Sequence, residues 1–168
     1  MIITGRVWKF GNNINTDLII AGKYKYDTLD MKEMAKHAFE ALRQGFHKKV
    51  KEGDIIVAGK NFGCGSSREQ APLILKALGI KVIMAESFAR IFYRNAINLG
   101  LLALECNGIF HAVEEGEVLR INLEEGTVEN ISSGAKLSFR PLPKLILAIF
   151  KEGGLVPYVK KNRGIRIE

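Results

Sequence analysis

The stretch that decides the fold runs from Asp54 to Leu78 and reads DIIVAGKNFGCGSSREQAPLILKAL. Its apolar beginning, Asp54–Ala58, predicts a strand buried on both faces. A turn with two glycines, Gly63 and Gly65, follows, and glycine allows positive φ and a close backbone approach. A helix is predicted over Ser67–Leu78, with Pro72 tolerated in its first turns. This order of strand, turn and helix favours an α/β fold.

Ser66, Ser67 and Arg68 follow the second glycine and give the turn its chemistry. We expect one of the two serines to cap the helix, so that free backbone N–H groups and the positive end of the helix dipole face one small volume. That volume would attract an anion, and Arg68 adds a planar set of donors suited to a carboxylate or phosphate. A simple turn with a capping serine and a solvated arginine fits the local sequence equally well.

Three common motifs with a glycine-rich turn do not fit. The Walker pattern requires a lysine at a position where this turn has none, and the dinucleotide-binding pattern has Arg68 in place of its third glycine. The nucleophile elbow G-x-S-x-G fails because Glu69 stands two residues after Ser67. These three classes of site are therefore not indicated.

The remaining pattern predicts alternating strands and helices, followed by short strands. Three strands separated by two helices between residues 54 and 104 imply parallel pairing with right-handed crossovers. After Gly108 the apolar period changes to that of short alternating strands. The predicted strands are Ile2–Phe10, Asp54–Ala58, Lys81–Ala85, Leu101–Leu104, Glu117–Leu123, Gly126–Asn130 and Lys136–Phe139, and the predicted helices are Met31–Phe46, Ser67–Leu78, Phe88–Asn98 capped by Ser87, Pro143–Lys151 and Leu155–Lys161.

Length and composition bound the class of protein. The chain has 168 residues, of which 47% are hydrophobic and 26% charged, as in an ordinary globular protein, and we expect one domain over residues 1–168. It contains no apolar run near the roughly 20 residues of a membrane span and no leader peptide, which favours the cytoplasm. The net charge of +7 fits solvated lysines and the attraction of small carboxylates, and no zinc-spacing or aromatic RNA-binding motif accompanies it.

The chain has two cysteines, Cys64 and Cys106. Two are too few for a four-cysteine metal site or a disulfide framework. Cys64 lies in the glycine turn, a kind of position in which thiols can be reactive. We interpret it as a packing residue.

Three segments closely resemble the small subunit of 3-isopropylmalate dehydratase, of the aconitase superfamily, in that family's order. They are GRVWKFGNNINTDLIIAGKY at Gly5–Tyr24, GKNFGCGSSRE at Gly59–Glu69 and SFARIFYRNAINLGLL at Ser87–Leu102. The resemblance covers essentially the whole chain and implies a swivelling β/β/α domain with a parallel-strand core and C-terminal short strands plus a helix. It further implies a hydro-lyase of leucine biosynthesis that interconverts 2-isopropylmalate and 3-isopropylmalate by dehydration and rehydration.

The same resemblance assigns roles to the turn. It implies that Ser66 is the base and that Ser67 and Arg68 bind the substrate carboxylate. A serine is a poor base unless deprotonated, and backbone N–H groups with Arg68 nearby would lower its pKa. The family carries a 4Fe-4S cluster on three cysteines, so we expect this chain to bind no cofactor and the cluster to lie on a partner large subunit.

The resemblance also assigns the loop after Gly22 to the substrate's variable side group. Tyr24 and Tyr26 offer apolar ring faces and the loop has no arginine, which favours an alkyl group over a third carboxylate. We expect Tyr24 or Tyr26 to line the alkyl pocket and Lys25 to face away. A solvated loop without selectivity is the alternative.

Several alternatives stay open at this point. The chain could be the small subunit of homoaconitase or of 2,3-dimethylmalate dehydratase, or a non-catalytic module that binds anions or RNA. Arg90 and Arg94 share one helix face, which either meets the partner or faces water. The polar cluster Asn15-Thr16-Asp17 is either a turn or helix cap, or the edge of the active site.

Overall fold

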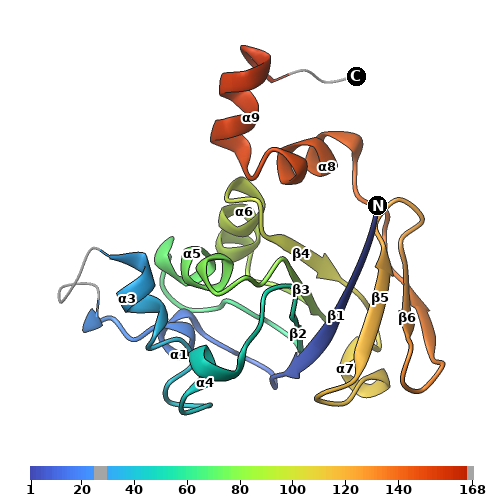
Figure 1. The fold of residues 1–168 in the computed structure, drawn as a ribbon, viewed down its shortest axis with the longest axis horizontal. Coiled ribbons are helices and arrows are strands. Elements are labelled where there is room, and N and C mark those ends of the chain that lie inside the picture. The colour runs from blue at the N-terminus through green and yellow to red at the C-terminus, as the bar shows by residue number, and fades with distance from the viewer. Residues whose placement is uncertain (25–29, 166–168) are drawn as a thin grey trace.

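A curled seven-stranded sheet forms the centre of the computed structural model, which describes residues 1–24 and 30–165 (Figure 1). The strand order is β4-β3-β2-β1-β5-β6-β7. β1 to β4 run parallel, whereas β5, β6 and β7 continue from β1 as antiparallel neighbours. The strands are β1 Ile2–Lys9, β2 Ile55–Ala58, β3 Val82–Ala85, β4 Leu102–Glu105, β5 Val118–Asn122, β6 Thr127–Asn130 and β7 Lys136–Ser138. The predicted parallel core and the later short strands are confirmed.

Helices and the antiparallel strands cover the two faces of the parallel half, which explains its continuous apolar sequence. Ile56, Ile83 and their neighbours on one face pack against α1, α3, α5 and α6. Ile55 and Met84 on the other face pack with β5, β6, α7 and α8. The helices are α1 Thr16–Ile19, α3 Met31–Ala35, α4 Phe46–Lys49, α5 Gln70–Ala77, α6 Arg90–Asn98, α7 Ile109–Ala112, α8 Lys144–Lys151 and α9 Leu155–Asn162. α9 rises away from the sheet at the top of Figure 1. In the described part of the chain, no helix is long and apolar enough to cross a membrane.

The helix predicted over Met31–Phe46 is wrong in its length. α3 ends at Ala35, a series of turns follows, and Phe46 begins the separate short helix α4. Phe39 adopts a left-handed backbone conformation with φ 53°, which a continuous helix does not permit. Its fully buried ring stacks on Phe10 at 4.1 Å between ring centroids, and its backbone N–H donates to the Ile19 carbonyl. Tertiary packing of this ring therefore overrides the local helical pattern.

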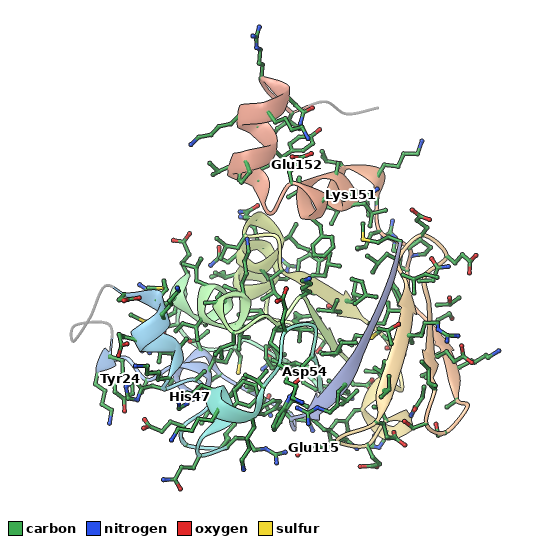
Figure 2. The ribbon with its side chains drawn as sticks, viewed as in Figure 1. Tyr24, His47, Asp54, Glu115, Lys151 and Glu152 are labelled. Atoms are coloured by element: carbon green, nitrogen blue, oxygen red, sulfur yellow. The ribbon has the colours of Figure 1, made fainter. Side chains whose placement is uncertain are left out.

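A buried carboxylate, Asp54, joins the start of β2 to β1 and to the loop after α4 (Figure 2). Asp54 Oδ2 accepts hydrogen bonds from Trp8 Nε1 at 2.8 Å and from the Lys51 backbone N–H at 2.9 Å, and it pairs with Arg6 at 3.0 Å. Burial opposes ionisation of Asp54, but these three donors outweigh it and lower the pKa of its carboxyl. Asp54 therefore stabilises the fold in its ionised form.

Replacing Asp54 by alanine is expected to lower the free energy of unfolding by about 3 kcal/mol, because buried donors lose a charged acceptor. Asp54→Asn retains an oxygen acceptor and should cost less. Since the folded-state pKa is lowered, this stabilisation is present above about pH 4 and is lost as the pH falls through the folded-state value. Urea unfolding of the three proteins between pH 7 and pH 2 measures this. Equal free energies of unfolding for the wild type and Asp54→Ala at pH 7 would contradict the stabilising role of ionised Asp54. So would a difference between these two proteins that does not become smaller in acid.

Candidate functional site

The glycine turn lies against the segment that leads into α1. Gly63 and Gly65 both have positive φ, 79° and 92°. The Gly63 N–H donates to the Ile14 carbonyl at 2.7 Å, and the Thr16 N–H donates to the Cys64 carbonyl at 2.9 Å. Thr16 Oγ1 also donates to the Ser66 carbonyl at 2.9 Å. The predicted cluster around Thr16 is therefore next to the turn.

A side chain at Gly63 would collide with α6. A Cβ built there would lie 2.1 Å from Cγ of Phe92, so the phenyl ring occupies the space that any larger residue would need. Phe92 in turn packs edge-on against Phe62, with ring centroids 5.3 Å apart. The turn is therefore fixed between α6 and the α1 segment.

Neither serine of the turn caps the following helix, which corrects the sequence prediction. α5 begins at Gln70 with Glu69 at the N-cap position, and no side chain makes a capping hydrogen bond there. Pro72 occupies the first turn, where its missing N–H is not needed. Ser66 and Ser67 instead stand exposed ahead of the helix, and among the described residues no backbone hydrogen-bond acceptor meets their N–H groups. Both serines are free to contact a ligand.

Two smaller predictions about helix starts have different outcomes. Asn15 is the N-cap of α1, because its Oδ1 accepts from the Leu18 N–H at 2.9 Å, so of the alternatives left open for this cluster the helix cap is present. Ser87 was expected to cap a helix from Phe88, but α6 begins at Arg90 without a side-chain cap. Ser87 Oγ accepts from the Asn61 backbone N–H at 2.9 Å and ties the next loop to the end of β2.

Arg68 contacts the predicted base directly. Its Nε–H donates to Ser66 Oγ at 3.1 Å, and its Nη1 donates to the Ile20 carbonyl at 3.1 Å. The same Nη1 forms an ion pair with Asp17 Oδ1 at 2.5 Å. A cation that donates to a hydroxyl oxygen favours negative charge on that oxygen. The structure thus brings the Arg68 guanidinium and the Ser66 hydroxyl into direct contact.

An open cavity of about 400 Å³ lies between the turn and α6. Ile91, with 55% of its surface exposed, gives it an apolar wall opposite the polar serines. Arg90 lines it, whereas Arg94 is not among its lining residues. Ile91 and Asn95 were not predicted as site residues, although their four-residue spacing on one helix face could have suggested it. The lining residues are Thr16, Gly63, Gly65, Ser66, Ser67, Arg68, Ala89, Arg90, Ile91, Phe92 and Asn95.

Tyr24, labelled in Figure 2, is not among the residues that line this cavity. Its ring stacks on His37 with centroids 3.8 Å apart, and its hydroxyl donates to Glu40. Because that bond favours the protonated phenol and the ionised carboxylate, it raises the pKa of Tyr24 and lowers the pKa of Glu40. Lys25 and Tyr26 lie outside the described residues.

The described residues form no cluster of three or more histidine, cysteine or acidic side chains that could hold a metal ion. Cys64 is half-buried in the turn, and Cys106 is buried after β4. Burial, and then the nearby charge of Glu86, raise the pKa of the Cys106 thiol to about 11. A cluster that needs three thiolates therefore does not fit this chain.

The fold and the serine–arginine turn define the class of protein. Residues 6–108 match the family model of the aconitase C-terminal domain. The chain is 54% identical to the isopropylmalate/citramalate isomerase small subunit of Methanocaldococcus jannaschii over 96% of this chain and 95% of that protein. It is 51% identical to 3-isopropylmalate dehydratase small subunit 1 of Thermotoga maritima over 96% of each chain.

A solved structure agrees with these sequence matches. The crystal structure of 3-isopropylmalate dehydratase from Methanocaldococcus jannaschii superposes with a TM-score of 0.90 at 45% identity, covering 97% of this chain and 96% of that one. This chain belongs to the family of 3-isopropylmalate dehydratase small subunits.

Proposed function

We propose that this chain is the small subunit of a hydro-lyase that interconverts 2-isopropylmalate and 3-isopropylmalate, a step of leucine biosynthesis. The observation that carries the proposal is the contact between Ser66 and Arg68 at the open cavity, in a chain that shares about half its residues with proteins named for this reaction. The proposal places the whole chain in the cytoplasm as one swivelling domain.

Different residues of the turn carry out proton transfer and substrate binding. Ser66 Oγ accepts the C–H proton in dehydration and returns it in hydration, and its anionic form is stabilised by Arg68 Nε–H. Ser67 and the Nη2 of Arg68 bind a substrate carboxylate, because neither donates a hydrogen bond to a described residue. The exposed backbone N–H groups of the turn add donors for charge that develops on the substrate.

Departure of the hydroxyl needs a Lewis acid, and we assign it to a 4Fe-4S cluster held by a separate large subunit. Two cysteines cannot supply the three thiolates that the family uses. The serines of this chain must then face the partner across the open side of the cavity. We propose that Arg90 takes part in this contact, since it lines the cavity and is exposed.

We propose that the loop containing Tyr24 and Tyr26 contacts the variable side group of the substrate. Within the described residues, Ile91 is the apolar side chain best placed to meet an alkyl group, because it is exposed at the wall of the cavity. Isopropylmalate and citramalate, which the Methanocaldococcus relative's name joins, differ in the size of their alkyl group. An apolar wall accepts both, with the smaller citramalate bound more weakly, since each methylene changes binding by only about 1–3 kcal/mol.

Assays of the assembled enzyme with isopropylmalate, citramalate, citrate and homocitrate-series acids test the proposal. We expect isopropylmalate and citramalate to be turned over and the tricarboxylates to react poorly. Lys25→Ala should leave this order unchanged, as should the control Lys32→Ala on the exposed face of α3. A strong preference for tricarboxylates that disappears with Lys25→Ala would replace the proposed substrate by a homoaconitate-type acid.

A further inference from the structure

One short segment holds the Arg68 guanidinium through residues that are not among those lining the cavity. We call Asp17, Ile20 and Gly22 the Arg68 clamp. Asp17 Oδ1 lies 2.5 Å from Nη1, and the Ile20 carbonyl accepts from the same nitrogen at 3.1 Å. Gly22 lies so close that an added Cβ would be 3.0 Å from Nη2, 3.2 Å from Nη1 and 3.3 Å from Cζ. All three residues come from α1 or the chain just after it.

The clamp fixes the direction of the other guanidinium nitrogens. A guanidinium is planar, so contacts at Nη1 set where Nε and Nη2 point. Here they direct Nε–H to Ser66 Oγ at 3.1 Å. Nη2 donates no hydrogen bond to a described residue.

The ion pair itself contributes little to the stability of the fold. The Asp17 side chain is 60% exposed, and exposed pairs are worth about 0–1 kcal/mol. Asp17 also bears a charge opposite to that of Arg68, so it weakens rather than strengthens the attraction of Arg68 for an anion. The value of the contact is therefore orientation of the guanidinium.

We propose that Asp17 and Gly22 are positioning residues, which hold Arg68 so that Nε serves the base Ser66 while Nη2 stays open to a substrate carboxylate. This role rests on the proposed function of Ser66 and Arg68. Asp17 provides the acceptor that orients the guanidinium, and the missing side chain of Gly22 provides the space in which it lies.

The first experiment compares Asp17→Ala with Asp17→Asn in the complex with the large subunit. Asp17→Ala should lower kcat/KM for isopropylmalate by about 10²-fold, as a misplacement near 1 Å does. It should also move the ascending limb of the pH–rate profile to higher pH, because Ser66 loses the donor that favours its anion. Asp17→Asn keeps an oxygen acceptor, so it should retain most of the wild-type kcat/KM. Its ascending limb should lie at the same pH as that of the wild type. Glu114→Gln, which alters the pair with Lys9 elsewhere, is the matched control.

A second pair of variants tests the space beside Arg68. Gly22 does not need the left-handed conformation, so Gly22→Ala adds a methyl group against the guanidinium without backbone strain. Gly11→Ala is its control, since a Cβ there meets no atom within 4 Å and its backbone is equally permissive. We expect Gly22→Ala to lower kcat/KM by about 10-fold or more and Gly11→Ala to leave it unchanged. Equal rates for the two variants would overturn the role of Gly22.

The clamp can also be observed without turnover. In the free wild-type chain, the NMR signal of Arg68 Nε–H should be protected from exchange by its bond to Ser66. It should be lost in Asp17→Ala and kept in Asp17→Asn. An unchanged signal or an unchanged pH profile in Asp17→Ala would overturn the role of Asp17. A wild-type complex that does not act on isopropylmalate, with the signal behaving as expected, would overturn the proposed function and leave the clamp standing.

Discussion

Ser66→Ala is expected to lower the kcat of the assembled enzyme by about 10²–10⁴-fold, the contribution typical of a positioned base. The variant removes the oxygen to which Arg68 Nε–H donates and therefore the group that would carry the substrate proton. The side chain of Ser66 is exposed and fills no part of the core, so the fold should persist. Steady-state rates with isopropylmalate, together with the melting curve of the variant, measure the effect.

The neighbouring serine provides a matched control. Ser67 stands exposed in the same turn and lines the same cavity, but no described contact joins it to Arg68. Its replacement by alanine should raise KM more than it lowers kcat, because a lost binding contact acts on the bound substrate and the transition state alike. Near-normal kcat in Ser66→Ala, or the larger kcat loss in Ser67→Ala, would assign the base elsewhere.

The parallel core could be predicted from the sequence because burial on both faces leaves a plain signature. β2 and β3 consist of four consecutive buried residues each, and a helix that returns the chain follows each of them. The turn between β2 and α5 was equally visible, since only glycine tolerates the positive φ of Gly63 and Gly65 at little cost. These features depend on local sequence alone.

The features that the sequence did not predict depend on distant partners. Phe39 ends a helical pattern because its ring fits a space beside Phe10, which no local rule reveals. The serines were expected at a helix N-cap, but Thr16 holds the Ser66 carbonyl and the turn continues to Glu69. Gly22 has an ordinary backbone, so only its distance from the Arg68 guanidinium shows its importance.

The small number of cysteines and the open site both indicate that catalysis by this chain depends on a second chain. The sequence has two cysteines, and they lie in different settings: Cys64 in the turn and Cys106 buried after β4. Ser66 and Ser67 are exposed, whereas covering a site from bulk water strengthens the electrostatic interactions that favour a serine base. One partner would meet both needs, by covering the cavity and by supplying the Lewis acid.

The purified chain is therefore expected to hold no stoichiometric iron and to show no dehydratase activity, and addition of the large subunit should bring turnover from undetectable to that of the native enzyme. Metal analysis and a turnover assay before and after mixing measure this. Cys64→Ala should assemble into an active complex, because the thiol is interpreted as packing within the turn. If the Cys64→Ala complex assembled without iron, this chain would supply a ligand to the cluster, which contradicts the assignment of the cluster to the large subunit. Turnover by the pure iron-free chain would show that its own residues are sufficient for the reaction, and would contradict the need for a partner.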